Sequence, residues 1–184
     1  MGRKIKLQIQ MSVDGYIAGL NDEMDWMQWN WDGQLKDYIR QLTDTVDCII
    51  LGRKLAEGFI PYWSTHPEEE GAENINKLPK IVFTKTLKQL EWTNTTLATG
   101  NLVDEITKLK KQEGKDIIVY GGADFVASLI QHKLIDEFHF LVNPTLLGNG
   151  KTIFKNITHS DLQLKKAIGF ECGISVLNYE LKQN

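Results

Sequence analysis

The sequence predicts an α/β fold in which a mostly parallel sheet is covered by helices on both faces. Short apolar strand patterns alternate with helical patterns along most of the chain, and this alternation is typical of parallel sheets. The last two strand patterns, near residues 162–170 and 174–181, have no helix between them. We therefore expect them to pair as an antiparallel hairpin around Cys172 and Gly173.

The first half of the chain begins with a strand pattern, because Ile5, Leu7 and Ile9 alternate with lysine and glutamine. Residues 32–43 carry an apolar stripe at helical spacing, and Asp32 stands where it can cap the first turn. Short apolar runs at 46–51 and 80–84 predict two more strands. We interpret the polar, acidic region 61–78 as a solvated loop or a short helix.

The second half continues the alternation. Residues 101–112 predict a helix that Asn101 caps and Gly114 ends. A strand at 116–120, a helix at 123–132 and a strand at 137–142 follow, and the last strand ends at Asn143 and Pro144. Because no internal repeat or low-complexity linker interrupts the pattern, we expect one domain over residues 1–184.

Composition narrows the classes of function. The net charge of -3 gives no basic excess, so nucleic acid is not an expected partner. The two cysteines, Cys48 and Cys172, do not form a metal-type spacing, and we expect a buried thiol at Cys48 and no metal. No apolar run approaches the length of a membrane span. We therefore expect a cytoplasmic protein that does not bind membranes.

The most informative stretch is a strand that stops at Gly121 and Gly122, with a helical pattern directly after them. Glycines let a backbone turn sharply and let a ligand approach it closely, and the free N–H groups at a helix start attract an anion. The stretch is thus a candidate phosphate cradle. A tight turn without a ligand is an equal alternative, because the dinucleotide fingerprint GxGxxG is absent.

Two further strand ends carry cations. Gly52 is followed by Arg53 and Lys54, which oppose the dipole of a helix start unless an anion offsets them. Thr84 and Lys85 follow the strand at 80–84. Ligands of open α/β sheets lie outside the carboxyl ends of the strands. The three junctions together therefore favour a phosphate-bearing ligand.

The order of short motifs resembles the dihydrofolate-reductase-like superfamily, and most of all the reductase domain of bacterial riboflavin biosynthesis and its stand-alone relatives. The motifs are SVDGYIAG from Ser12, LGRK from Leu51, VFTKT from Val82, VYGGADF from Val119 and DEFHFLVNPTLLGNG from Asp136. The resemblance covers nearly the whole chain. It implies a three-layer α/β/α fold with a mixed, mainly parallel sheet that binds NADPH.

The resemblance also implies which residues hold the cofactor. Arg53 matches the residue that grips the adenosine 2′-phosphate, with Gly52 and Lys54 beside it, and Thr84 and Lys85 match the neighbouring contact. Ile17 and Ala18 match the segment along the nicotinamide. The turn over the pyrophosphate matches Gly121, Gly122, Ala123, Asp124 and Phe125.

The substrate side departs from these families. Gln34 stands where dihydrofolate reductases hold the pterin with an acidic residue, and Leu141 stands in place of a threonine. Tyr120 occupies the place near which riboflavin-pathway reductases carry a glutamate. The zinc deaminase motifs of the bifunctional riboflavin enzyme, HxE and PCxxC, are absent.

Two further features are candidates for the substrate side. Trp26, Trp29 and Trp31 lie in one short segment, and Trp26 matches a tryptophan of dihydrofolate reductases. They can stack on a planar heterocycle, of a substrate or a flavin, or can simply pack the loop against the sheet. Asp14 is a candidate catalytic residue that donates a proton through water or binds a substrate amine; the alternative is a turn residue that bonds its own backbone.

The expected function is an NADPH-dependent reductase that transfers hydride to a C=N or C=O carbon of a small heterocyclic or sugar-derived substrate. It would resemble either the phosphoribosylaminouracil reductase of riboflavin biosynthesis or dihydrofolate reductase. The alternative is a non-catalytic NADPH-binding or sensor module that has lost the substrate pocket. We also expect a homodimer, because the strand at 137–142 and the turn at 146–150 match a subunit-pairing region of riboflavin-type relatives.

Overall fold

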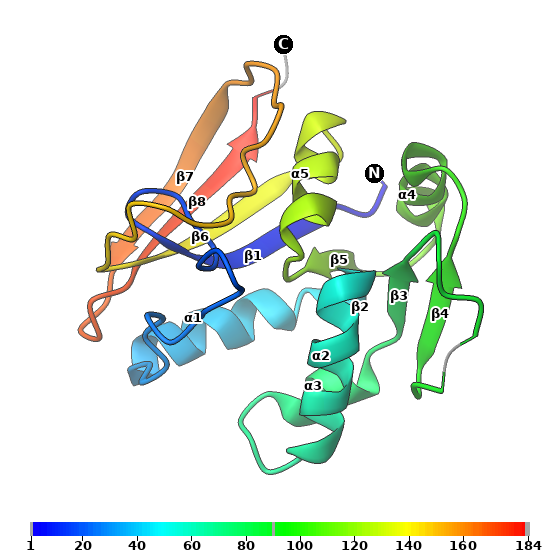
Figure 1. The fold of residues 1–184 in the computed structure, drawn as a ribbon, viewed down its shortest axis with the longest axis horizontal. Coiled ribbons are helices and arrows are strands. Elements are labelled where there is room, and N and C mark those ends of the chain that lie inside the picture. Colours follow the sequence, from blue (N-terminus) through cyan, green and yellow to red (C-terminus); the bar gives the residue numbers. More distant parts are fainter. Residues whose placement is uncertain (1, 90, 183–184) are drawn as a thin grey trace.

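The computed structural model describes residues 2–89 and 91–182. They form one eight-stranded sheet with the strand order β4-β3-β2-β5-β1-β6-β8-β7. The strands are β1 (Ile5–Ser12), β2 (Val46–Gly52), β3 (Lys80–Phe83), β4 (Thr95–Ala98), β5 (Asp116–Val119), β6 (Glu137–Asn143), β7 (Leu162–Gly169) and β8 (Ser175–Leu181). Figure 1 shows the sheet with β7 at one edge and β4 at the other.

The sheet is mixed, as the sequence predicts. From β4 to β6 every pairing is parallel, whereas β6–β8 and β8–β7 are antiparallel. The C-terminal hairpin therefore extends a parallel sheet by two strands. The fold is the dihydrofolate-reductase-like α/β arrangement that the motifs imply.

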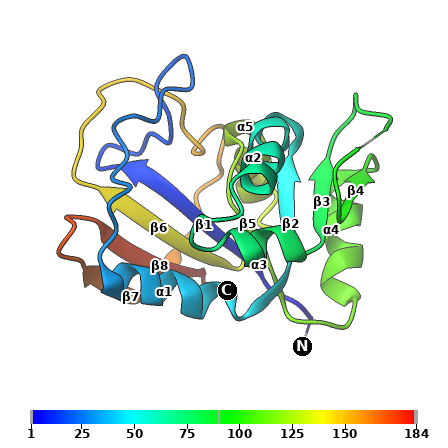
Figure 2. The same cartoon turned by 90° about the horizontal axis from the view of Figure 1, so that it is seen from below.

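The helices lie in two layers. The chain builds α1 (Gly33–Thr43), α2 (Arg53–Thr65), α3 (Ala72–Lys77), α4 (Leu102–Lys111) and α5 (Ala123–Gln131). Side chains of α4 and α5 pack with Ile5, Leu7 and Ile9 on one face of the sheet. Helices α1, α2 and α3 lie on the other face, as Figures 1 and 2 show, and their apolar side chains pack against it.

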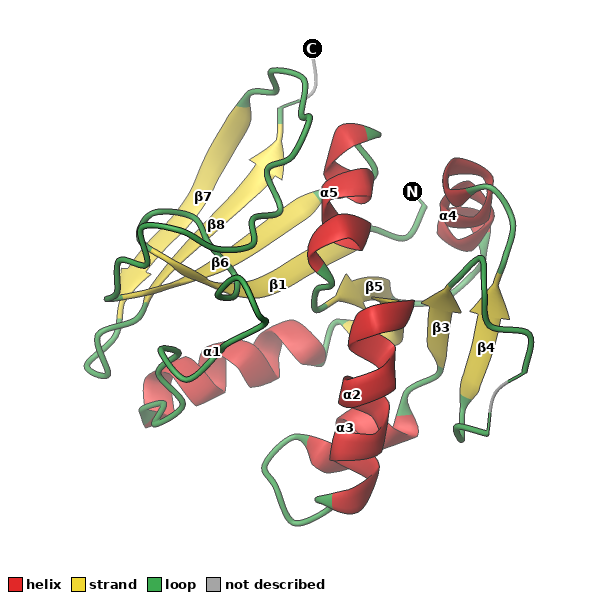
Figure 3. Cartoon of the chain, viewed as in Figure 1, coloured by secondary structure: helices red, strands yellow, loops and turns green. Residues whose placement is uncertain are grey.

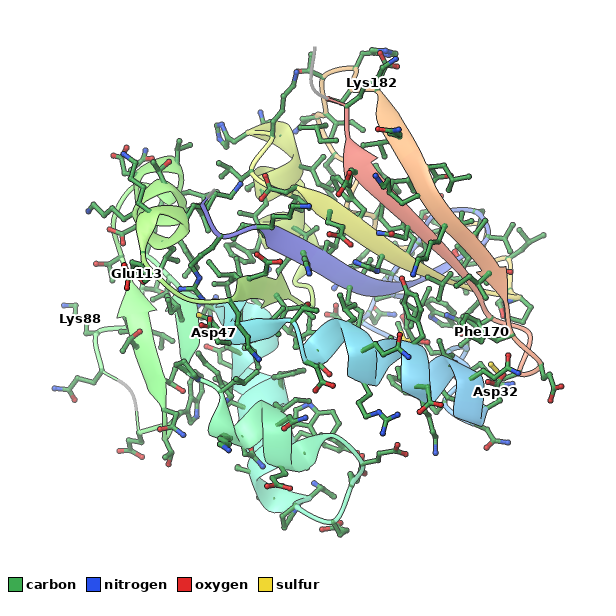
Figure 4. The ribbon with its side chains drawn as sticks, turned by 180° about the vertical axis from the view of Figure 1, so that it is seen from behind. Asp32, Asp47, Lys88, Glu113, Phe170 and Lys182 are labelled. Carbon is green, nitrogen blue, oxygen red and sulfur yellow. The ribbon has the colours of Figure 1, made fainter. Side chains whose placement is uncertain are left out.

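Two predicted caps start their helices. Asp32 accepts a hydrogen bond from the Leu35 N–H at 2.9 Å, and Asn101 accepts from the Val103 and Asp104 N–H groups. Asp32 also accepts from the Cys172 N–H at 3.0 Å, which ties the start of α1 to the β7–β8 turn. Asp32 and Phe170 lie at the same end of the molecule in Figure 4.

Some elements differ from the sequence prediction. β4 (Thr95–Ala98) was not predicted, because four residues with two adjacent threonines carry no clear alternation. The region 61–78 holds the end of α2, which continues through Pro61 to Thr65, and the short helix α3. Cys48 is buried within β2, as expected.

The polar side of β1 is covered rather than solvated. Lys6 is 7% exposed, and its ammonium lies 3.0 Å from Asp116 and donates to the Thr45 hydroxyl. Gln8 and Gln10 share this face, toward α1 and α2. The alternation in β1 thus places its polar side chains beneath α1 and α2 rather than in solvent.

Candidate functional site

The candidate site lies at the carboxyl edge of the parallel strands. Helix α2 begins at Arg53, directly after β2 ends at Gly52. Helix α5 begins at Ala123, after β5 and the Gly121–Gly122 turn. Because β2 and β5 are neighbours in the sheet, the two helix starts lie side by side.

Glycines let these two helix starts touch. A Cβ atom on Gly52 would lie 2.7 Å from the Phe125 Cβ, so any larger residue would push the segments apart. Gly121 and Gly122 have φ angles of 145° and 88°, a region that disfavours other residues. The position of a Cβ on Gly122 lies 3.9 Å from the Gly52 Cα. Close approach therefore requires glycine at position 52, and the backbone angles favour glycine at positions 121 and 122.

Neither helix start has a side-chain cap among the described residues. The first backbone N–H groups of a helix lack partners within the helix and carry partial positive charge. Two such starts in contact form a cradle of N–H donors, hereafter the cradle, comprising residues 52–55 and 121–125. These residues fit the diphosphate of a dinucleotide.

Charged side chains surround the cradle. The Arg53 guanidinium donates to the Glu57 carboxylate at 2.7 Å within α2. Asp124 lies between Lys155, at 3.0 Å, and Lys54, at 3.9 Å. The Lys155 hydrogen bond and the positive charge of Lys54 hold the pKa of Asp124 below its usual range. The Asp124 carboxylate thus lies beside two lysines, and a bound diphosphate would compete with it for their charge.

The third predicted junction has a different character. Thr84 is buried, and its hydroxyl oxygen accepts hydrogen bonds from the Thr86 and Leu87 N–H groups at 3.1 and 3.0 Å. Lys85 is exposed beside it. Thr84 therefore shapes the turn, and Lys85 is the side chain of this junction that can reach a ligand.

The loop after β1 is bound to the loop after β6, and Figure 3 shows both as long irregular segments. The Ile17 N–H donates to the Lys151 carbonyl, and the Lys151 N–H donates to the Ala18 carbonyl, both at 2.8 Å. Gly150 packs so closely on the Ala18 carbonyl that a Cβ there would clash. Ile17 and Ala18 are thus held in a fixed backbone arrangement.

Asp14 joins the same two loops. Its carboxylate accepts from the Ser12 hydroxyl at 2.6 Å and from the Leu147 and Gly148 N–H groups at 3.2 and 2.7 Å. The Ser12 bond and then the backbone donors lower the pKa of Asp14. Asp14 is accordingly ionised at neutral pH, and this geometry favours the turn-residue interpretation over proton donation.

The predicted substrate residues lie on separate elements. The Trp26 indole donates to the Glu23 carbonyl, whereas Trp29 is 62% exposed and Trp31 packs against the core near Leu35. Gln34 is exposed on the first turn of α1. Tyr120 stacks on Phe59 of α2 with ring centroids 5.5 Å apart, and burial raises the pKa of its phenol.

A polar group that the sequence did not single out lies under α1. The Tyr38 hydroxyl is 2.6 Å from His139 Nδ1, and His139 Nε2 is 2.9 Å from the Glu137 carboxylate. Gln8 pairs with His139 across the β1–β6 register. In the sequence these residues are scattered over positions 8, 38, 137 and 139. The one available signal was the glutamine pattern on the polar face of a strand predicted to be covered on both sides.

A hollow of about 240 Å³ lies elsewhere, beneath the loop at 154–162. Its walls include Phe138, Phe140, Phe154 and Ile157, and none of its lining residues belongs to the cradle. Within the described ranges no three His, Cys, Asp or Glu side chains gather as a metal site. Nor is any helix there long and apolar enough to cross a membrane.

The comparison with known proteins identifies the family. The model of the RibD C-terminal domain family matches residues 3–176. The chain belongs to the RibD C-terminal domain family. It is 30% identical over 182 residues to the uncharacterized protein YyaP of Bacillus subtilis (strain 168), covering 96% of this chain and 94% of YyaP. It is 29% identical over 166 residues to YwjB of the same organism, covering 90% and 91%.

Solved structures share the RibD-like fold. A putative riboflavin biosynthesis protein from Shewanella sp. PV-4 matches with a TM-score of 0.77 and 23% identity over 100% of both chains. A bifunctional deaminase and 5-amino-6-(5-phosphoribosylamino)uracil reductase from Thermotoga maritima matches with a TM-score of 0.72 and 14% identity. That match covers 98% of this chain and 57% of the Thermotoga chain.

Proposed function

We propose that this RibD-type domain is an NADPH-dependent reductase acting on a C=N or C=O carbon of a small heterocyclic or sugar-derived substrate. The observation that carries the proposal is the contact between the uncapped starts of α2 and α5 at Gly52 and Gly122. Two adjacent sets of free N–H groups suit two linked phosphates. The family membership supports the same cofactor.

The cradle residues would bind the diphosphate, and Arg53 with Lys85 would contact the 2′-phosphate. Ile17 and Ala18, fixed by the loop after β6, would lie along the nicotinamide. Bound NADPH supplies hydride, and the protein supplies position and exclusion of water. The ionised Asp14 holds the two loops together rather than supplying a proton.

Cofactor choice is the first test. Wild type should bind NADPH more tightly than NADH, and Arg53→Ala should lose about ten- to a hundred-fold of its NADPH affinity, because one charge-assisted contact disappears. Its NADH affinity should change little. Fluorescence titration with both nucleotides measures this. The matched control is Arg40→Ala, which removes an exposed arginine paired with Asp37 on α1.

Glu57→Gln completes the comparison. Removal of the carboxylate frees Arg53 from its partner within α2, so NADPH affinity should be equal to or above that of wild type. Equal affinity of wild type for NADPH and NADH would contradict the 2′-phosphate assignment.

The second candidate is a non-catalytic NADPH-binding or sensor module. It is favoured by the engagement of Asp14 with the Leu147 and Gly148 backbone, because this carboxylate is then not free to act on a substrate. Leu141 is buried and carries no polar group that could hold one. NADPH oxidation against a panel of pterins, pyrimidines and simple carbonyls separates the two. Tight NADPH binding without turnover would favour the module.

A further inference from the structure

A polar row crosses the sheet beneath α1 and α2. Gln8 of β1 is paired in register with His139 of β6 on one side. On the other side Leu7 pairs with Val119, so Tyr120 is the next residue alongside Gln8. Tyr120 stacks on Phe59 of α2, and His139 bonds Tyr38 of α1. Gln8 therefore lies between side chains presented by the two helices.

The hydrogen bonds around His139 indicate which of its nitrogen atoms carries a proton. Glu137 accepts from His139 at 2.9 Å and is flanked by Lys4 at 3.9 Å and by the Asn178 amide at 3.3 Å. The His139 bond, followed by the charges of His139, Lys6 and Lys4, lowers the pKa of Glu137 to about 2. Glu137 is thus ionised and accepts a hydrogen bond, so Nε2 of His139 carries the proton and donates it.

The other imidazole nitrogen faces Tyr38. In neutral His139, Nδ1 accepts the Tyr38 O–H, whereas in the imidazolium form Nδ1 donates and the phenol proton is free to turn outward. Burial, and then the charge of Glu137, raises the pKa of Tyr38 to about 12, so the phenol carries its proton at neutral pH. An edge contact with Phe170 holds the ring in place.

Gln8 supplies an independent sign of a ligand. Its Oε1 atom is buried and has no hydrogen-bond partner within residues 2–89 and 91–182. A buried carbonyl oxygen without a donor is costly, so an outside donor is expected there. The same row continues through Tyr120 to the Gly121–Gly122 turn of the cradle. The unfilled acceptor thus lies between the relay residues and the proposed cofactor site.

We propose that Tyr38 is the catalytic proton donor of the reductase. His139 and Glu137 are positioning residues, through which a proton returns to the Tyr38 phenolate. This rests on the proposed function. When the substrate carbon takes hydride from NADPH, the electron pair of the C=N or C=O bond moves to nitrogen or oxygen. That atom takes the Tyr38 proton, and the phenolate takes the Nδ1 proton of imidazolium His139. Glu137 stabilises the imidazolium, and solvent reprotonates His139 after product release.

Gln8 would contact the same substrate. Its oxygen can accept from an N–H or O–H donor, and its amide nitrogen can donate to a carbonyl. Gln8→Leu should raise the KM of the substrate about ten-fold, while NADPH affinity stays unchanged.

Tyr38→Phe is the decisive variant, because it keeps the ring and removes only the hydroxyl. Loss of a general acid lowers kcat by about 10²- to 10⁴-fold, and NADPH affinity should be unchanged. Glu137→Gln should lower kcat and increase the solvent deuterium isotope effect, whereas Glu137→Asp should restore part of the rate. The control is Tyr62→Phe, whose hydroxyl donates to Glu69 on the surface and should be neutral.

A readout without cofactor or substrate accompanies the kinetics. In imidazole ¹H–¹⁵N spectra, the His139 Nε2 proton should exchange slowly in wild type and rapidly in Glu137→Gln. Wild-type kcat in Tyr38→Phe, or a His139 tautomer protonated at Nδ1 alone, would overturn the relay while leaving the reductase intact. Failure of wild type to bind NADPH, or to turn over any of the panel, would overturn the proposed reductase and the relay with it.

Discussion

At the scale of single residues, Glu137 shows how an ionised group can serve both stability and chemistry. Its side chain is 17% exposed and lies between His139 and Lys4. The pKa falls from 4.5 to about 2 in the folded protein. A carboxylate with a depressed folded pKa stabilises the fold above its unfolded pKa, and this stabilisation disappears as the pH falls toward the folded value.

We therefore predict a pH-dependent cost for Glu137→Gln. At pH 7 the variant should lose on the order of 3 kcal/mol of unfolding free energy, and the gap to wild type should shrink as the pH falls from 4.5 toward 2. Urea denaturation across this range measures it. Glu180→Gln removes a surface partner of Lys4 and Lys165 and should cost below about 1 kcal/mol. A gap that stays constant with pH would contradict the prediction.

Gly122 belongs to the cradle and has a φ angle that disfavours other residues. At φ 88° an alanine is strained by about 1–2 kcal/mol, and relief of that strain would move the backbone N–H groups of the cradle. Gly122→Ala should therefore weaken NADPH binding while the protein stays folded, as judged by circular dichroism and nucleotide titration.

The matched glycine is Gly58 inside α2, where a Cβ would meet nothing within 4 Å. Gly58→Ala should stabilise the protein by about 0.5–1 kcal/mol and leave binding unchanged. Normal NADPH affinity in Gly122→Ala would mean that the glycine serves the turn alone.

At the scale of elements, the capping residues of α1 and α4 differ in the number of segments that they bond. Asn101 caps only α4, whereas Asp32 caps α1 and also accepts from the Cys172 N–H of the β7–β8 turn. Asn101→Ala should cost about 1 kcal/mol and Asp32→Ala clearly more. Chemical denaturation of the two variants checks this, and equal losses would show that the Cys172 contact contributes nothing.

Local sequence signals predicted some of these elements and missed others. Local signals such as the Asp32 and Asn101 caps predicted helices, and the alternation of Ile5, Leu7 and Ile9 with polar residues predicted β1. The last turn of α2 was not predicted, because it follows Pro61 and proline usually ends a helix. Contact between the cradle turns followed from strand order, which the sequence left open beyond a mostly parallel sheet.

The polar row could not be predicted for a related reason. Tyr38, His139 and Gln8 lie on a helix and two strands far apart in the chain. The β1–β6 register brings Gln8 to His139, and the packing of α1 brings Tyr38 to it. No spacing rule connects such positions. The cofactor residues, in contrast, stand in short contiguous motifs, which is why the resemblance named them and why they remain the best-defined prediction.

At the scale of the whole molecule, the strand half of the predicted pairing region is interior, whereas its turn at 146–150 is partly exposed. The strand at 137–142 lies inside the sheet, and Phe138 and Phe140 are buried in the core of the chain itself. Exposed apolar side chains remain at Leu146, at 72%, and at Leu164 on the edge strand β7, at 52%. An exposed edge strand of this kind favours association.

We predict that light scattering at micromolar concentration gives twice the mass of one 21.0 kDa chain. Leu164→Glu should shift the population toward monomer, because it places a charge on the edge of the sheet, whereas Lys166→Glu on the same strand should not. A wild-type mass of one chain would contradict the dimer.

The central place of β1 has a consequence for synthesis. Its strand partners are β5 and β6, which begin at Asp116 and Glu137. During translation the first strand must therefore wait, unpaired, until more than half of the chain has left the ribosome. Pairings between such distant segments also slow folding. The nascent first strand should thus be a target for chaperones, long before the loops after β1 and β6 can lock together.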